Sequence, residues 1–214
     1  MTAPPPWTLN GDGLVLVAHF PEAFVREHGF LAEFQQTGYR GWLSAVMLVD
    51  YTTSDVGPYR ELLFIPGLFS VGGKTTFSIS KIYVSTQVSV ENGIENWGIP
   101  KEQADFDITH NPDGSRTYVV SQQGKPFFTV RATAGGFSFP VSTRLLPGFQ
   151  VVQKRRGELL LTAPTATGKG QLARLRDLQI DPAFFPDITQ GTRLATIAVR
   201  DFTMVFPVPF LISD

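Results

Sequence analysis

One lysine in this sequence stands in a setting that would make it chemically reactive. Lys101 follows Pro100, in apolar surroundings that include Trp97 and Ile99. Proline fixes its own backbone φ and restricts the residue before it, so the lysine follows a rigid step. In an apolar site the pKa of an amine falls, and the neutral amine can attack a ketone to form a Schiff base. Because most lysines are exposed, a surface lysine after a turn is the alternative interpretation.

The segment around this lysine resembles the active-site segment of acetoacetate decarboxylases. That segment is usually written Gly-Arg-Glu, three or four mostly apolar positions, and then Pro-Lys-Lys. The positions that match without a gap are Gly93, Glu95, Pro100 and Lys101. Upstream, residues 58–61 (Pro-Tyr-Arg-Glu) resemble the Tyr-x-Glu that supplies an active-site carboxylate in the family. On these residues the chain is identified as a divergent member of the acetoacetate decarboxylase-like superfamily.

The resemblance implies roles for several side chains. Lys101 would be the Schiff-base lysine, and Glu61 would be the carboxylate that orients the substrate or handles a proton. Glu95 would be a second wall or support residue. Each carboxylate has an alternative: Glu61 could be a half-exposed strand residue paired with an arginine, and Glu95 could be a charge on a helix face. The other substrate-binding candidates are Trp97, Tyr83 and Phe69, although core packing explains Trp97 and Phe69 equally well.

The resemblance also implies a fold and an assembly. We expect a mainly β protein: a single-domain, antiparallel, cone-shaped β-barrel or double-layered sheet with a few outer helices, over residues 1–214. We expect residues 1–10 to be a loose N-terminal segment. Because family members tend to form large symmetric homo-oligomers, we expect a homo-oligomer here.

Three departures from the family pattern bear on the substrate. The second lysine of Pro-Lys-Lys is Glu102, whose carboxylate would raise the pKa of Lys101 if it lay beside the amine. The arginine of Gly-Arg-Glu is Ile94. The family's arginine near the first strand and glutamate in the next strand have no counterpart in residues 11–14 or 42–46. The pocket is therefore short of groups that would place a substrate carboxylate, which favours a more apolar substrate or one that is not a β-keto acid.

The sequence pattern itself predicts a chain dominated by strands. Gly, Pro, Asn or Asp residues bound each strand-like run. These runs are Leu14–His19, Trp42–Tyr51, Tyr59–Ile65, Thr75–Ser85, Arg116–Ser121, Pro126–Ala132, Phe149–Gln153, Glu158–Pro164, Gln171–Ile180 and Thr192–Phe206. Alternating strand and helix units are absent from the pattern, which argues against a doubly wound α/β fold.

Helices are few, and one strand shows an informative alternation. We predict an outer helix over Pro21–Phe34 and a short helix over Asn92–Trp97. Within Phe77–Ser85, alternation places Lys81 on the same face as Tyr83. Lys81 is thus either a second amine near the pocket or, as we favour, a side chain that extends from a strand face toward solvent.

Composition excludes several classes of function. The hydrophobic fraction of 43% supports a sizeable core, and the net charge of −1 gives no global case for binding nucleic acid or an anionic membrane. The sequence has no cysteine, and its three histidines have no ligand spacing, so we expect no metal site. We expect no organic cofactor. With no apolar run of 18 residues and no targeting pattern, we expect a cytoplasmic protein without a membrane partner.

Two classes of function remain open. The first is a Schiff-base-forming lyase, most simply a decarboxylase of a β-keto acid or related carbonyl compound that forms an imine with Lys101. An imine-dependent aldolase or dehydratase would use the same intermediate. The second is a non-catalytic β-barrel that binds an apolar small molecule.

Overall fold

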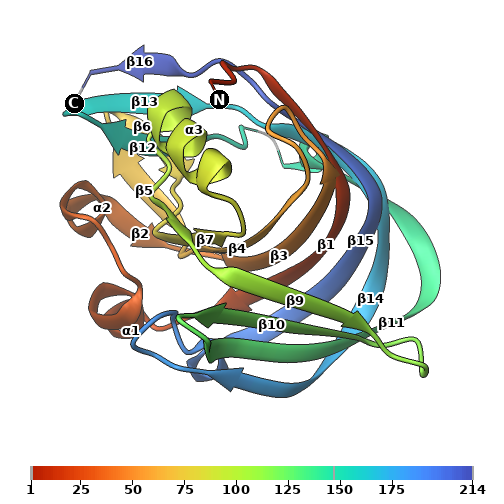
Figure 1. The fold of residues 1–214 in the computed structure, drawn as a ribbon. Helices are drawn as coiled ribbons and strands as arrows, with labels where there is room; N and C mark the ends of the chain where they lie inside the picture. The colour runs from red at the N-terminus through yellow and green to blue at the C-terminus, as the bar shows by residue number, and fades with distance from the viewer. Residues whose placement is uncertain (1, 147, 214) are drawn as a thin grey trace.

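The computed structural model describes residues 2–146 and 148–213, which fold mainly into β-strands (Figure 1). The α-helices in these residues are α1 (Glu22–His28), α2 (Glu33–Gly38) and α3 (Gln87–Trp97). Single 3-10 turns occupy Thr143–Leu145 and Ile188–Gln190. The strands of the first half are β1 (Trp7–His19), β2 (Tyr39–Gly41), β3 (Ser44–Thr53), β4 (Tyr59–Ile65), β5 (Leu68–Val71), β6 (Lys74–Phe77), β7 (Lys81–Val84) and β8 (Lys101–Gln103). Those of the second half are β9 (Asp105–His110), β10 (Arg116–Gln122), β11 (Lys125–Ser142), β12 (Val151–Arg155), β13 (Glu158–Thr162), β14 (Thr165–Ile180), β15 (Thr192–Phe206) and β16 (Phe210–Ile212).

The strands form two sheets. The larger sheet has the order β8-β7-β4-β3-β1-β15-β14-β11-β10-β9, and all its neighbouring pairs are antiparallel except β7 with β8. It curls into a nearly closed barrel (Figure 1). The smaller sheet has the order β16-β13-β12-β6-β5-β2 and lies near α3 at one end of the barrel. The expected fold, a mainly β barrel-like structure with a few outer helices, is confirmed.

Strand β4 is buried on both faces, which explains its continuous apolar run. Leu62 and Phe64 belong to a first apolar cluster inside the barrel. Leu63 and Ile65 belong to a second cluster on the opposite face of the strand. Successive strand residues point to opposite faces, so Glu61 enters the second cluster together with Leu63 and Ile65. The fold thereby places a carboxylate within an apolar layer.

The helix predicted over Pro21–Phe34 is wrong in extent, because two helices occupy this region. Helix α1 ends before Gly29, whose amide donates to the Val25 carbonyl at 2.8 Å. A Cβ at Gly29 would lie 2.3 Å from that carbonyl oxygen, so glycine permits this ending. Phe30 follows with a φ of 55°, which breaks the helical path before α2 begins.

The strand predicted over Thr75–Ser85 is two strands in different sheets. β6 belongs to the smaller sheet and β7 to the larger one, and residues 78–80 cross between them. Side-chain hydrogen bonds stabilise this crossing. The Ser78 hydroxyl donates to the Val152 carbonyl at 2.7 Å, and the Gln153 side-chain Nε2 donates to the Ile79 carbonyl at 3.0 Å. The crossing resets the alternation, so residues before and after it do not share the faces that one continuous strand would give.

The expected loose segment over residues 1–10 is wrong for its second half. Residues 7–10 are the first residues of β1, where Trp7 pairs with Phe206. Trp7 is buried, and the Ala3 amide donates to the Asn92 side-chain oxygen at 2.8 Å. This segment therefore packs against α3 and contributes to the second cluster.

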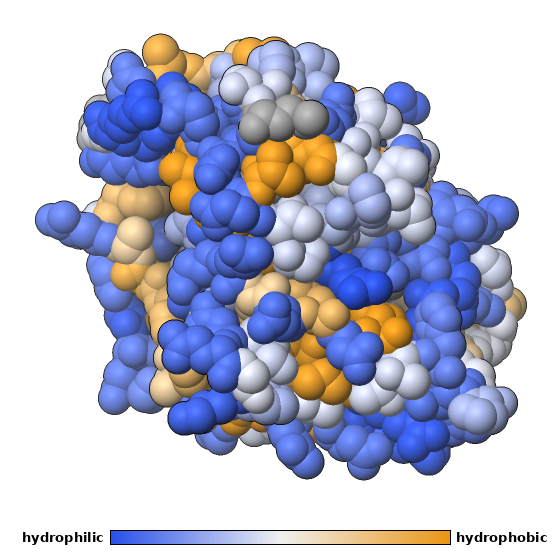
Figure 2. Space-filling model, viewed as in Figure 1, coloured by the Kyte–Doolittle hydropathy of each residue, from blue (hydrophilic) through white to orange (hydrophobic). Residues whose placement is uncertain are grey.

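The molecular surface is mixed in character. On the face shown in Figure 2, hydrophilic side chains dominate and apolar ones form small separate patches. Within residues 2–146 and 148–213, none of the helices is both long and apolar enough to cross a membrane.

Candidate active site

Helix α3 and strand β8 together position Lys101. The helix ends at Gly98, which takes the left-handed conformation with a φ of 69° and turns the chain back toward β8. Lys101 is the first residue of β8 and is in register with Ile82 of the parallel strand β7. Its side chain is only 4% exposed. The chain therefore directs this lysine inward, toward the second apolar cluster.

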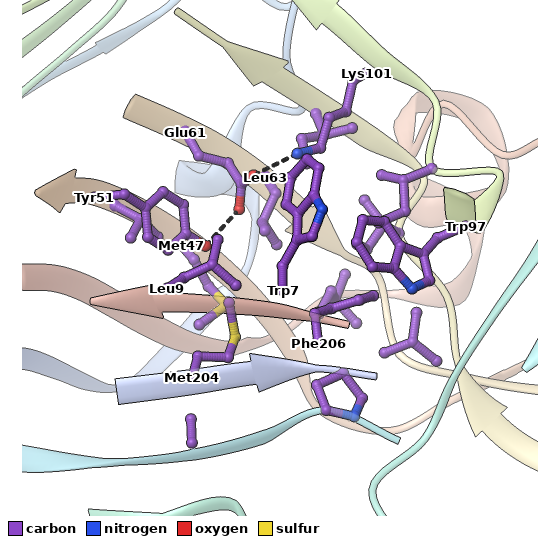
Figure 3. Close-up of a pocket in the computed structure, with 18 of the residues that line it drawn as sticks. Trp7, Leu9, Met47, Tyr51, Glu61, Leu63, Trp97, Lys101, Met204 and Phe206 are labelled. Carbon is purple, nitrogen blue, oxygen red and sulfur yellow. Dashed lines mark hydrogen bonds and ion pairs between the residues drawn. The ribbon is translucent and has the colours of Figure 1, made fainter. Parts of the chain in front are cut away.

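The Lys101 amine is surrounded by three oxygen atoms. Its Nζ lies 3.3 Å from Glu61 Oε2, 3.0 Å from Ser89 Oγ and 3.5 Å from the Tyr59 hydroxyl. Figure 3 shows the Lys101 and Glu61 side chains pointing toward one another. The Glu61 and Tyr59 oxygens come from β4 and the Ser89 oxygen comes from α3, whereas the amine is on β8.

Glu61 is itself held in place from its other side. The Tyr51 hydroxyl on the neighbouring strand β3 donates to Glu61 Oε1 at 3.2 Å, which leaves Oε2 facing the lysine. Burial, together with the Glu61 charge, raises the pKa of Tyr51 and of Tyr59 well above the usual value. Both phenols therefore remain protonated at neutral pH, and Tyr51 serves as a steady hydrogen-bond donor to the carboxylate.

A cavity of about 140 Å³ adjoins this ion pair. The carboxylate of Glu61 and the amine of Lys101 are the charged groups among its described lining residues, and most of the wall is apolar. The apolar part of the wall is formed by Trp7, Leu9, Met47, Val49, Leu63, Ile65, Ile79, Ile82, Trp97, Ile99, Phe149, Val151, Pro164, Ala166, Met204 and Phe206. A ligand in this cavity would meet one amine and one carboxylate inside an apolar container.

Burial is the main influence on the lysine. It lowers the pKa of Lys101 below the usual 10.5, because the ammonium form loses its hydration, while the Glu61 carboxylate opposes this change. A lower pKa increases the fraction of neutral amine, which is the nucleophilic form. The site can thus supply an amine nucleophile next to a carboxylate that can accept or return a proton.

Glu102 does not lie beside the reactive amine. Neighbouring strand residues point to opposite faces, so Glu102 points away from the side of the sheet that Lys101 enters. Its Oε1 lies 2.5 Å from the Nζ of Lys81 on β7. Lys81, considered above as a second amine, is thereby paired with Glu102 and lies outside the described lining of the cavity.

The structure brings some of the predicted site residues together and separates others. Trp97 lines the cavity, where its ring contacts Trp7 edge to face at a centroid distance of 4.9 Å. Glu95 is 55% exposed and pairs with Arg156 at 2.7 Å, so it lies outside the cavity. Phe69 and Tyr83 also lie outside it, because both belong to the first cluster.

Several residues of the site were not predicted from the sequence, and Ser89, Tyr51 and Trp7 are the clearest examples. Ser89 lies four residues before Gly93 on α3, and this spacing places both on one helix face. Tyr51 had no signal in the sequence, because only the register of β3 with β4 brings it to Glu61. Trp7 lies within residues 1–10, which the sequence predicts to be a loose segment. Among the described residues, no group of three or more His, Asp or Glu side chains could hold a metal ion.

Residues 43–152, just over half of the chain, match the acetoacetate decarboxylase family. No curated protein matches the sequence significantly.

Several solved structures share the fold. An acetoacetate decarboxylase from Legionella pneumophila is 11% identical, with a TM-score of 0.76 over 99% of this chain and 88% of that one. The enduracididine biosynthesis enzyme MppR, solved with pyruvate, is 15% identical, with a TM-score of 0.70 over 100% of this chain and 93% of that one. An acetoacetate decarboxylase-like enzyme from Sphingomonas wittichii is 12% identical, with a TM-score of 0.72 over 100% of this chain and 95% of that one.

Proposed function

Because the chain belongs to the acetoacetate decarboxylase family, we propose that it is a Schiff-base-forming lyase in which Lys101 reacts with the carbonyl carbon of a small molecule. One observation carries the proposal: the buried Lys101 amine lies 3.3 Å from the Glu61 carboxylate at the wall of an apolar cavity. A lysine with a lowered pKa is a nucleophile that forms imines with carbonyl substrates.

The first stage forms a carbon–nitrogen bond. The neutral Lys101 amine attacks the carbonyl carbon, and the carbonyl oxygen takes a proton to give a carbinolamine. The carbinolamine then takes up a second proton at its hydroxyl and loses water, which leaves a cationic iminium. Glu61 faces the nitrogen throughout, so its carboxylate can carry protons between nitrogen and oxygen and stabilise the positive charge.

The second stage breaks a carbon–carbon bond of the substrate. The iminium accepts the electron pair of the bond between the α carbon and its leaving group, and a neutral enamine results. In a β-keto acid the leaving group is carbon dioxide, and a proton then replaces it on the α carbon. Hydrolysis of the imine releases the product and restores Lys101. Decarboxylation is the simplest such reaction, and an imine-dependent aldolase or dehydratase would use the same iminium.

A non-catalytic role as an apolar ligand-binding barrel is the second candidate. It is favoured by the three oxygens around Lys101 Nζ, which would satisfy an ammonium group without any reaction. In that case the lysine would serve to bind a polar group of the ligand.

Reductive trapping distinguishes the two candidates. Borohydride reduces an imine to a stable secondary amine, so incubation with a methyl ketone and borohydride near pH 7 should add one label at Lys101. The other five lysines should remain largely unlabelled. K101A should lose the label because alanine has no amine, and K101R should lose it because the guanidinium of arginine stays protonated. K125R, which alters an exposed lysine, is the matched control and should keep it. Labelling spread evenly over the lysines would support the binding protein instead.

A further inference from the structure

A second cavity adjoins the site of Lys101. It has a volume of about 310 Å³ and lies between strands β1, β3, β14 and β15 and residues 141–146. The two cavities share six lining residues, which are Met47, Val49, Tyr51, Thr143, Ala166 and Met204. The walls are therefore continuous from the reactive amine into the second space. In the view of Figure 3, Met204 lies on the side of the first cavity away from Lys101.

The walls of this second cavity are apolar. None of its described lining residues carries a charged side chain, and its polar side chains are the hydroxyl groups of Tyr51, Ser142, Thr143 and Thr167. On β1 the alternating residues Gly13, Val15 and Val17 face it, and Val15 is in register with Ile197 of β15. An anionic or cationic group placed here would lose its hydration without a partner, whereas a hydrocarbon chain would gain by leaving water.

Glycine at position 13 adds to this space. A Cβ built there would approach no atom outside its chain neighbours closer than 3.5 Å, so packing does not demand glycine. The missing side chain leaves room above the strand. The methionines at the junction add adaptability, since methionine side chains adjust to irregular contacts.

We propose that the second cavity holds the apolar tail of the substrate whose carbonyl carbon reacts at Lys101. The substrate class is thus a ketone or keto compound that carries an extended hydrocarbon chain rather than a short, highly polar β-keto acid. This inference rests on the proposed function, and it adds the substrate class to it. Each methylene of the tail that enters the cavity should strengthen binding about fourfold, until the cavity is full.

A series of methyl ketones with methyl, propyl, pentyl, heptyl and nonyl chains tests the proposal. Reductive labelling at Lys101 is measured against ketone concentration for each chain. The half-saturating concentration should fall about fourfold for each added methylene and then level off. Equal half-saturating concentrations for all chains, with labelling still at Lys101, would overturn the tail proposal and leave the proposed function intact.

Variants locate the tail. V15F narrows the second cavity and should reduce the ratio of nonyl to propyl ketone labelling, by about fourfold for each methylene that no longer fits. V15A should move the plateau to longer chains, which keeps the test decisive if V15F folds poorly. V205F is the matched control, because Val205 is partly exposed on β15 and lines neither cavity. A ratio that V205F and V15F change equally would count against the assignment.

Binding without reaction separates the two proposals. Calorimetry with K101M, which cannot form an imine, should still show affinity that rises with chain length. If no ketone labels the unmodified protein, the proposed function falls and the reactive-substrate form of the tail proposal falls with it. Calorimetry then shows whether the cavity binds a hydrocarbon chain without reaction. If the affinity does not change with the chain length of the ketone, binding of the chain in this cavity is rejected too.

Discussion

The alkyl chain of Lys101 lies directly over Gly93 of α3. A Cβ at position 93 would come within 2.6 Å of Lys101 Cδ and 2.8 Å of its Cε. The absent side chain is what lets the lysine pass close to the helix and reach Ser89, one turn earlier on the same face. The glycine of the sequence motif thus has a steric role toward its lysine.

Replacing Gly93 with alanine should slow the reaction of Lys101 but leave the free energy of unfolding nearly unchanged. The new Cβ displaces the lysine side chain, so the amine moves away from Glu61 and Ser89, and we expect imine labelling to slow by about tenfold or more, as small misplacements of reacting groups do. Alanine favours a helix by about 1 kcal/mol over glycine, which should largely offset the steric cost to stability. Labelling kinetics and urea unfolding measure the two effects. E91A, at an exposed position of α3, is the control that should change neither greatly.

The buried pair of Lys101 and Glu61 should behave as one unit in stability measurements. K101M leaves a buried carboxylate whose remaining partner is Tyr51, and E61L leaves a buried amine, so each should lower the free energy of unfolding by about 3–5 kcal/mol. The double variant E61L/K101M removes both charges and should lose far less than the sum of the two. Urea unfolding of the four proteins gives the coupling. Additive losses would show that the two groups do not interact strongly.

The pH dependence of labelling should reveal the lowered pKa of Lys101. Labelling needs the neutral amine, so its rate should rise with pH and level off below pH 10.5, whereas exposed lysines would still be gaining reactivity there. E61Q removes the carboxylate that opposes the shift, so its profile should move to lower pH while its maximal rate falls for want of a proton carrier. A profile that moves to higher pH in E61Q would contradict this account.

The same shift has a consequence for stability. The folded pKa of Lys101 lies below its unfolded value, so the unfolded chain binds more protons between these two values. Stability contributed by this group therefore rises with pH across that window. K101M should remove this rise, which unfolding at several pH values between 7 and 10 measures.

The sequence predicted the parts of the fold that local pattern controls. Strands β4 and β15 run as expected over Tyr59–Ile65 and Thr192–Phe206, because turn residues mark both ends of each. The crossing at residues 78–80 was not predictable, since its buried serines resemble the polar face of a strand. Only the partners of these residues in the smaller sheet show that the chain changes sheets there.

The sequence motif predicted the central pair of the site but not the position of Glu95. The resemblance paired Lys101 with Glu61, and the structure places their side chains 3.3 Å apart. Glu95 follows Gly93 by two residues, which corresponds to a rotation of about 200° around a helix, so it faces away from the lysine. The sequence predicts this helix only from residue 92, whereas α3 begins at Gln87. The helical position of Ser89, on the same face as Gly93, was therefore not predicted.

Glu102 follows Lys101 at the position where the family motif has its second lysine. E102K should leave the rate and pH profile of Lys101 labelling unchanged, since residue 102 points away from the cavity and its carboxylate pairs with Lys81. The change places a second ammonium group beside that of Lys81, whose side chain is only 13% exposed. It should therefore lower the free energy of unfolding by more than the contribution of a fully exposed pair, which is about 0.2–1 kcal/mol. E102Q, which removes the pair without adding a like charge, should cost less. Faster labelling in E102K, with a profile moved to lower pH, would instead show that residue 102 acts on the reactive amine.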